Sequence, residues 1–338
     1  MPEPSISVTP IPKTRLKKIT LKNDSLTVVL LNYGARLHQI LAPDKEGHFE
    51  NVLLTYDNFS DVLTDQSYFG AIVGPVAGRI KHGSWENHQL EKNEGNHHIH
   101  GGSNGWSFQY WKVEVFKTPT SIGVVFYLQD TFSDYPGPIT TTVTYQLTKN
   151  KLEMIIKTSS LTETICNPTN HAYFNLSGNG KRDIDEHELA IQTEGMLELD
   201  HEKIPTGALI ATTSLPIHFK HPHSLKEILA VYPNGLDDVF VLNVPKRNKK
   251  ILTLSEKKTG RQLSIATTNK SVVLFSTTGF EADFLINGQK MHSNYGLAIE
   301  PQEFPDAVHF PEFGSITLYP GQEKISYTSY QFNVLKEE

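Results

Sequence analysis

The sequence predicts an all-β protein built from large antiparallel sheets, arranged as a sandwich or a barrel. Apolar and polar residues alternate with a period of two in many short segments, turn dipeptides separate those segments, and windows with helical periodicity are scarce. Strict alternation is typical of half-buried strands. Many short strands between Gly- and Pro-rich turns are typical of sandwiches and barrels.

The alternation is clearest in two neighbouring segments. In residues 121–128 four apolar side chains fall on one face, and residues 140–147 alternate in the same way. Shorter strands are expected at residues 152–156, 251–254, 262–266, 272–276, 316–318 and 325–327. Turns are indicated by Asn104-Gly105, Pro136-Gly137, Asn179-Gly180, Asn234-Gly235, Asn287-Gly288 and Pro320-Gly321.

Helices are expected to be few and short. Residues 57–63 and 224–230 could each form one, with Asp57 and Ser224 as N-caps. Residues 246–250 form a basic run, which we interpret as the solvated tip of a hairpin.

Composition places the chain among globular proteins. Of its 338 residues, 38% are hydrophobic and 20% are charged, which is far from the composition of disordered chains. Length alone suggests about two domains, but all-β architectures often reach this size as one unit. The sequence has no repeat and no low-complexity linker, so residues 1–338 are expected to form a single domain. The formal net charge of -6 argues against a nucleic-acid partner.

Cysteine use and the N-terminal residues bear on location. Cys166 is the only cysteine, so no intramolecular disulfide can form, which fits a reducing compartment. Residues 1–13 lack the apolar region of a secretory signal. The longest apolar runs fall far short of the roughly 20 residues that span a bilayer. We therefore expect a soluble cytoplasmic protein with no membrane partner.

Three segments have the residue types of a catalytic or binding site. The first, Gly95-Asn96-His97-His98-Ile99-His100-Gly101-Gly102, places three imidazoles next to paired glycines. His98 and His100 would share one face of a strand, which permits a metal site, but no third ligand with zinc-site spacing accompanies them. We interpret His97 and His98 as solvent-exposed turn residues. His100 is the stronger candidate, because the glycines let a ligand approach closely.

The second segment is Asn167–Gly178, and its centre is His171, flanked by amides and aromatic residues. Sugar sites combine planar polar side chains, which bond hydroxyl groups, with aromatic faces, which pack on C–H groups. Histidine is also the side chain best suited to exchange protons near neutral pH. The alternative is a half-buried histidine with a satisfied hydrogen bond, and this segment alone leaves both interpretations open.

The third segment is 296–307, in which Glu300 follows an apolar strand and precedes Pro301. A carboxylate at the end of a core strand would be partly desolvated and its pKa raised, as a general base near neutral pH requires. The alternative, an exposed acid at a strand end, describes Glu303 and Asp306 better than Glu300.

Two smaller features complete the set. Arg79 presents five N–H donors beside Gly78, which suits an oxygen-rich ligand. Asp237 lies in a predicted turn, where aspartate commonly caps the backbone. Each of the two, taken alone, fits a structural role better than a functional one.

Two motifs are specific: Asn170-His171-x-Tyr173-Phe174-Asn175-Leu176-Ser177-Gly178 and Glu300-x-Gln302-x-x-Pro305-Asp306-Ala307. With them, in order along the chain, come Asn32-Tyr33-Gly34-Ala35, Gly74-x-x-x-Gly78-Arg79-Ile80, His100-Gly101-Gly102, Tyr135-Pro136-Gly137-Pro138, Asp237-x-x-Phe240 and Leu318-x-Pro320-Gly321. In this set and order the chain resembles the aldose 1-epimerase (galactose mutarotase) family over nearly its whole length.

The resemblance implies a β-sandwich of the galactose mutarotase-like type, with few short helices and an open cleft for a small-molecule sugar. It implies that Glu300 takes a proton from the anomeric hydroxyl while His171 donates one to the ring oxygen, so that the ring opens and closes on its other face. Arg79, His100 and Asp237 match sugar-binding positions. No cofactor or metal is implied, and the protein would be a monomer or a homodimer.

The chain also departs from the family pattern. The family often has Gly-Arg-Val-Ala-Asn-Arg where this sequence has Gly74-Pro75-Val76-Ala77-Gly78-Arg79, so one arginine and one asparagine are missing. Near residue 280 the family usually has a sugar-binding glutamine, and Asp283 is expected at that position. These departures leave open which sugar is the substrate.

Other functions would make other demands on the sequence. A disaccharide such as maltose would need aromatic platforms, which Trp85, Trp106 and Trp111 could supply if they are not core residues. A hexose 6-phosphate would need more cations near the pocket than Arg79. A non-catalytic carbohydrate-binding module would not need both His171 and Glu300. A metal-dependent hydrolase would depend on His98 and His100.

Overall fold

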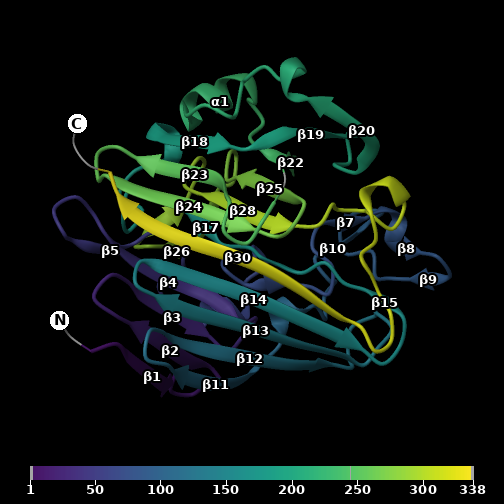
Figure 1. Cartoon of the computed structure of the whole chain (residues 1–338), viewed down its shortest axis with the longest axis horizontal. Helices are drawn as coiled ribbons and strands as arrows, with labels where there is room; N and C mark the ends of the chain where they lie inside the picture. Colours follow the sequence, from purple (N-terminus) through teal and green to yellow (C-terminus); the bar gives the residue numbers. More distant parts are fainter. Residues whose placement is uncertain (1–2, 244, 336–338) are drawn as a thin grey trace.

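The computed structural model describes residues 3–243 and 245–335, and strands dominate them. Figure 1 shows these strands in layers of sheet, with the single α-helix of the described residues at the upper edge of the view. The ladders of the three largest sheets are all antiparallel. The predicted all-β antiparallel fold is confirmed.

The largest sheet of the described residues has nine strands, and Figure 1 shows most of them in succession from bottom to top. In spatial order they are β11 (Lys112–Lys117), β12 (Ile122–Asp130), β13 (Ile139–Thr148), β14 (Lys151–Ser160), β30 (Glu323–Val334), β24 (Arg261–Thr267), β23 (Lys250–Glu256), β18 (His187–Ile191) and β21 (His223–Ser224). In β13 every second side chain from Ile139 to Leu147 is buried, as the alternation predicted. The C-terminal strand β30 lies between β14 and β24, so it joins the two halves of this sheet.

A six-stranded sheet packs on the nine-stranded one. Its order is β17 (Tyr173–Phe174), β28 (Leu297–Gln302), β25 (Ser271–Ser276), β22 (Asp237–Leu242), β19 (Thr193–Leu199) and β20 (Pro205–Ala211). Leu297 and Ile299 of β28 belong to the main hydrophobic core, which also contains residues of β13, β14 and β30. Ala298 of the same strand belongs to a second apolar cluster on the opposite face. The two faces of β28 are therefore buried against different surroundings.

The N-terminal residues form a five-stranded sheet of β1 (Ser5–Pro10), β2 (Lys17–Lys22), β3 (Thr27–Leu31), β4 (Arg36–Pro43) and β5 (Phe49–Asn51). Short two-stranded ladders complete the fold. They pair β6 (Ile72–Val73) with β16 (Thr169–Asn170), β7 (Arg79–Ile80) with β10 (His98–Ile99), β8 (Ser84–Trp85) with β9 (His88–Gln89), β15 (Thr164–Ile165) with β29 (Thr317–Leu318), and β26 (Ala282–Ile286) with β27 (Gln289–Met291).

One of the two predicted helices forms. Helix α1 (Leu225–Val231) begins after Ser224, whose hydroxyl accepts from the Glu227 N–H while the Glu227 side chain accepts from the Ser224 N–H. The other prediction, at residues 57–63, is wrong except for a 3₁₀ turn at Asp61–Leu63. Asp57 does not cap that turn, because its carboxylate accepts from the Gly288 N–H of the β26–β27 hairpin. No helix of residues 3–243 and 245–335 has the length and apolar character needed to cross a bilayer.

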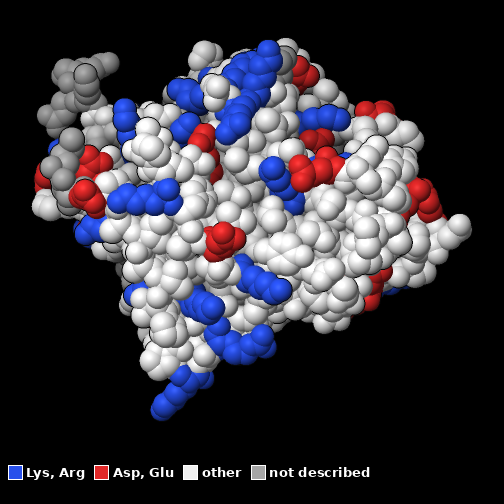
Figure 2. Space-filling model, turned by 60° about the horizontal axis from the view of Figure 1, so that its bottom comes forward, with Lys and Arg blue, Asp and Glu red and all other residues white. Residues whose placement is uncertain are grey.

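The basic run at residues 246–250 is exposed, as predicted, but it is not a hairpin tip. It connects β22 of the six-stranded sheet to β23 of the nine-stranded sheet. Figure 2 shows one face of the molecule on which Lys and Arg side chains form separate groups with Asp and Glu side chains among them. This mixed surface matches the small net charge of -6.

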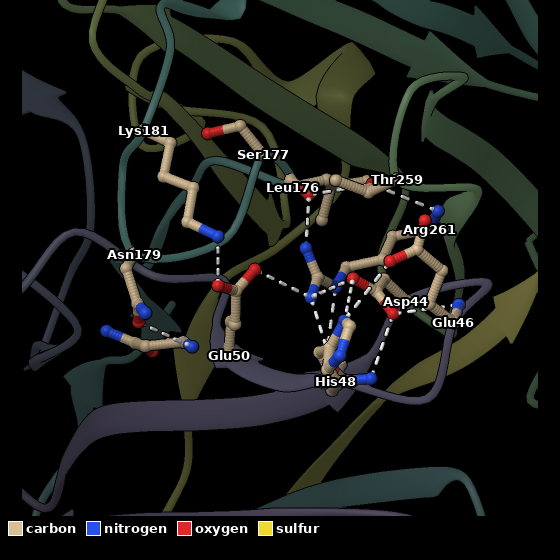
Figure 3. Close-up of polar contacts among 12 residues, drawn as sticks. Asp44, Glu46, His48, Glu50, Leu176, Ser177, Asn179, Lys181, Thr259 and Arg261 are labelled. Atoms are coloured by element: carbon tan, nitrogen blue, oxygen red, sulfur yellow. Dashed lines mark hydrogen bonds and ion pairs between the residues drawn. The ribbon is translucent and has the colours of Figure 1, made fainter.

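A buried arginine ties three parts of the chain together, as Figure 3 shows. Arg261 of β24 is 1% exposed and donates to the carbonyl oxygens of Ala42, Leu176 and His48. It also pairs with a carboxylate oxygen of Glu50 at 3.0 Å. These bonds fix the β4–β5 hairpin and the loop that follows β17 to the middle of the nine-stranded sheet.

We expect Arg261→Met to lower the free energy of unfolding by about 3–5 kcal/mol, because the Glu50 carboxylate then loses its buried partner. Lys181→Met is the matched control: Lys181 also pairs with Glu50, but its side chain is 53% exposed. That pair should contribute only about 0–1 kcal/mol. Urea titration of both variants measures the difference, and equal losses would contradict the role given to Arg261.

Candidate active site

A cavity of about 540 Å³ lies over one face of the six-stranded sheet. The antiparallel registers place Tyr173 opposite Ala298, Ala298 opposite Phe275 and Phe275 opposite Asp237, so these side chains share that face. Glu300 lies opposite Val273 in the next row of the same face. The remaining walls come from loops around residues 66–68, 78–79 and 93–103.

His171 and Glu300 meet at the bottom of this cavity. The Nε2 atom of His171 lies 3.4 Å from a carboxylate oxygen of Glu300. Both residues are buried, at 5% and 2% exposure. His171 is fixed by its backbone, which donates to the Ala71 carbonyl and accepts from the Gly70 N–H. Glu300 is fixed by its place in β28, where it pairs with Val273 of β25.

Each member of the pair keeps one atom without a partner. Within the described part of the chain, neither the Nδ1 atom of His171 nor the second carboxylate oxygen of Glu300 makes a hydrogen bond. The side-chain oxygen of Gln302, two residues further along β28, is in the same condition and also lines the cavity. Buried polar atoms are normally bonded, so these three indicate a site shaped for a polar ligand.

Burial shifts the proton affinities of the pair in opposite directions. Burial raises the pKa of Glu300 well above its ordinary value; the Asp237 carboxylate adds to this rise and the Arg79 guanidinium opposes it. Burial lowers the pKa of His171 to about 4. Over the range between these values the pair therefore holds one exchangeable proton. It can give a proton to one atom and take one from another without changing its total charge.

His100 is a neutral hydrogen-bond donor. Its Nδ1 atom accepts from the Gly78 N–H at 3.2 Å, so the ring proton is assigned to Nε2. Burial lowers the pKa of His100 well below its usual value, and the neighbouring His171 and Arg79 add to this effect. The ring lies edge-on to that of His171, with centroids 5.3 Å apart. The loop needs Gly101 for this geometry, since a Cβ there would lie 1.9 Å from the Gly74 carbonyl oxygen.

Arg79 stands between two acids on the cavity wall. Its guanidinium lies 2.8 Å from Glu94 and 3.5 Å from Asp237. Asp237 lies on β22, so this contact joins the cavity wall at Arg79 to the six-stranded sheet. The fork is thus held in place and still borders the cavity, where it can meet hydroxyl oxygens.

Comparison with known proteins identifies the chain's relatives. The model of the family described as aldose 1-epimerase matches residues 17–331. The chain belongs to the aldose 1-epimerase family. It is 30% identical to a galactose mutarotase of Bos taurus over 335 residues, which cover 96% of each chain. It is 31% identical to an aldose 1-epimerase of Streptococcus thermophilus over 320 residues, 90% of this chain and 91% of that one.

Solved structures agree with this assignment. The chain matches the crystal structure of a galactose 1-epimerase from Lactobacillus acidophilus with a TM-score of 0.85 and 26% identity, covering 99% of each chain. The galactose mutarotase-like fold expected from the sequence is confirmed, and the chain is an isomerase of the epimerase type.

Five of the six predicted site residues line the cavity of this epimerase: His171, Glu300, Arg79, His100 and Asp237. The structure does not place Asp283 with them. Asp283 lies on β26, where its side chain is 97% exposed and pairs with Lys290 at 2.8 Å. The residue of that segment which does line the cavity is Phe280.

Two expectations about the His97–His100 segment are wrong. His97 and His98 are buried, not exposed. His98 bonds the Glu91 carbonyl through Nδ1 at 2.7 Å and the Tyr135 hydroxyl through Nε2 at 2.8 Å, so it cannot join His100 at a metal. Its sequence neighbours gave no sign of these distant partners.

A different trio could offer metal ligands. Ligand atoms of His100, His171 and Glu300 lie within 4.8 Å of one another. For His100 the bond from Gly78 occupies Nδ1 and leaves the proton on Nε2, which makes that atom a donor and not a ligand. The trio is therefore better suited to hydrogen bonding than to holding a metal.

The expectation that Asp306 is an exposed acid is also wrong. Asp306 is fully buried and accepts from the Lys81 N–H at 3.0 Å. Asp306 therefore has a structural role, because it joins the loop after β28 to the segment that follows Arg79.

The three tryptophans are core residues and do not line the cavity. Aromatic walls come instead from residues that the sequence did not single out, chiefly Tyr68, Phe108, Phe275 and Phe280. Tyr68 has a positive φ of 58°, which a tyrosine rarely adopts, and its ring centroid lies 4.9 Å from that of His100. Lys203 was missed as well, because only the tertiary fold brings its turn to the cavity.

The raised pKa of Glu300 has a consequence for stability. The folded chain holds this proton more tightly than the unfolded chain does, so the contribution to stability is full below the unfolded-state pKa and is lost as pH rises through the folded-state pKa. Glu300→Gln lacks this titration. We expect its Tm to match the wild type near about pH 4 and to exceed it at about pH 8.

Calorimetry at several pH values measures this difference. Glu46→Gln is the control, since it replaces a carboxylate that is 68% exposed and does not line the cavity. A Glu300→Gln difference that stays constant from acid to alkaline pH would contradict the shift.

Proposed function

We propose that this chain interconverts the α and β anomers of a hexose such as galactose or glucose by acid–base ring opening, with Glu300 and His171 as the catalytic residues. The observation that carries the proposal is the pair itself: a buried carboxylate and a buried imidazole 3.4 Å apart at the bottom of a cleft. Opening a hemiacetal requires one proton removed and one delivered, and this pair is arranged to do both.

In the empty site burial favours the proton of the pair on Glu300. The reaction begins once this proton has passed to His171, 3.4 Å away, which leaves a carboxylate and an imidazolium. Glu300 takes the proton of the anomeric hydroxyl, and a C=O bond forms at C1 as the bond from C1 to the ring oxygen breaks. The released electron pair stays on the ring oxygen, which takes a proton from His171. Rotation about C1–C2 then turns the other face of the aldehyde to the hydroxyl, and the ring closes with the two roles reversed.

The other lining residues bind and orient the sugar. The Nε2–H of His100 donates to an oxygen near the reacting centre. Arg79 and Asp237 supply a donor fork and an acceptor for hydroxyl groups further along the ring. Tyr68 and the other aromatic residues offer faces for the C–H groups. We further propose that residues 1–338 act as one domain, as a monomer or homodimer in the cytoplasm, which fits the buried free thiol of Cys166.

Substitution of either catalytic residue tests the proposal. We expect His171→Asn and Glu300→Gln each to lower kcat by about 10²–10⁴, the usual contribution of a general acid or base. Polarimetry on freshly dissolved α-galactose, α-glucose and maltose measures the rate and ranks the sugars. His48→Asn and Glu46→Gln are matched controls with exposed side chains. Near-normal turnover in His171→Asn or Glu300→Gln would leave a binding module as the better description.

The pH profile provides an independent test. Activity requires the one exchangeable proton of the pair, so kcat/KM should fall as pH drops through the lowered pKa of His171, about 4, and as it rises through the raised pKa of Glu300. Asp237→Asn removes a charge that raises the Glu300 pKa. The alkaline limb should therefore move to lower pH, with a higher KM from the lost sugar contact. An unmoved limb, or one displaced to higher pH, would be incompatible with this electrostatic coupling.

A further inference from the structure

A second cavity, of about 280 Å³, lies apart from the first and shares none of its lining residues among those described. Its walls are the ends of β14 and β30, the 166–168 loop, and the residues that follow β28 and β24. The lining residues are Ile156, Thr158, Cys166, Asn167, Pro168, Asn269, Glu303, Ser315, Lys324, Ile325 and Ser326. Nothing in the acid–base reaction uses them.

The cavity contains an ammonium group that lacks an ion pair. Lys324 of β30 donates to the Ser315 carbonyl at 3.2 Å, which uses one of its three N–H groups. Among the described residues no carboxylate oxygen lies within 4.0 Å of this ammonium. Burial lowers the pKa of Lys324, and the nearby Cys166 and Glu303 oppose this fall.

The Glu303 carboxylate lines the same cavity but forms no ion pair with Lys324. The only ion pair of Glu303 in the described chain is with Lys270, at 3.7 Å, and the Lys270 side chain is 50% exposed. Burial raises the pKa of Glu303, and Lys270 and Lys324 oppose this rise. A cation and an anion thus line one cavity, and the two are separated by more than the length of an ion pair.

We propose that this cavity binds a small oxyanion that also carries a hydroxyl group, of which monohydrogen phosphate is the simplest. Its charged oxygens accept from Lys324, and its hydroxyl donates to the Glu303 carboxylate. Asn269 and Ser326 lie on the wall as neutral polar partners. Glu303 then acts as a filter, because an oxyanion without a proton would meet carboxylate oxygen against oxygen and be repelled.

The cavity adjoins both segments that carry the catalytic residues, because Asn167 and Glu303 line it. The Asn167 side chain donates to the Glu303 carbonyl at 3.0 Å and accepts from the Glu303 N–H at 2.9 Å. Asn167 precedes β16, which leads into His171, and Glu303 follows β28, which carries Glu300. A bound oxyanion would therefore contact Asn167 and Glu303, whose two hydrogen bonds join the segments that carry His171 and Glu300.

Calorimetric titration of the full chain with inorganic phosphate and with sulfate, near neutral pH and at constant ionic strength, tests the proposal. Near neutral pH phosphate keeps a proton and sulfate has none, although the two ions have similar size and shape. We expect phosphate to bind about tenfold tighter than sulfate, as one charge-assisted hydrogen bond gained and one repulsion avoided would give. Equal binding of the two ions, or binding of neither, would overturn it.

Two variants assign the binding to this cavity. Lys324→Gln should weaken phosphate binding about tenfold or more. Glu303→Gln should let sulfate bind within about twofold of phosphate, because an amide can donate to an unprotonated oxygen. Lys157→Gln, an exposed lysine on the neighbouring strand β14, is the control and should change nothing. Neither Lys324 nor Glu303 lines the catalytic cavity, so sugar turnover reports whether both variants are folded. Undiminished phosphate binding in Lys324→Gln, or selectivity retained in Glu303→Gln, would refute the site.

Discussion

The register of β28 is the constraint on which the rest of the site depends. All six residues of this strand are buried, so both of its faces are committed. Leu297 and Ile299 belong to the main core between the sheets, whereas Glu300 faces the cavity. A shift of one residue would place a carboxylate in the core and an isoleucine in the cavity, because the side-chain period of a strand is two. Pairing with both β17 and β25 fixes the register, and apolar burial on one face thereby holds Glu300 in place on the other.

The cost of this arrangement is visible in the same residues. Burial works against the charged forms of His171 and Glu300, and one polar atom of each has no hydrogen bond to any described residue. A structure selected only for stability would bond such atoms or replace them with apolar groups. The surrounding contacts instead distribute charge around the pair: Arg79 opposes the rise in the Glu300 pKa, and Glu94 and Asp237 balance Arg79. These polar atoms stay available to a ligand, and the protein without a ligand loses stability as a result.

The sequence predicted what depends on local pattern and missed what depends on distant contacts. The alternation of β13 and the capping box at Ser224 are local, and both predictions are confirmed. The motifs around His171 and Glu300 led to residues that do meet in the cavity. Exposure was misjudged at His98 and Asp306, because their partners, Tyr135 and the Lys81 backbone, lie far away in the sequence. Tyr68 and Lys203 reach the cavity from turns whose direction no sequence pattern fixes, and Asp283 lies on a hairpin that turns away from it.

The site also draws on distant parts of the chain. Arg79 and His171 lie within residues 1–180 and Asp237 and Glu300 within residues 181–338, so neither part contains the catalytic pair. The two parts are linked by β30, which lies between β14 and β24, by the pairing of β17 with β28, and by the bonds of Asn167 to Glu303. Because β17 covers only the first two residues of β28, two side chains hold the far end of that strand beside the His171 segment: Asn167 bonds the Glu303 backbone, and the Thr169 hydroxyl donates to the Pro301 carbonyl at 2.8 Å. The 3.4 Å between His171 and Glu300 is thus set from both ends of β28, by a backbone ladder at one end and by the side chains of Asn167 and Thr169 at the other.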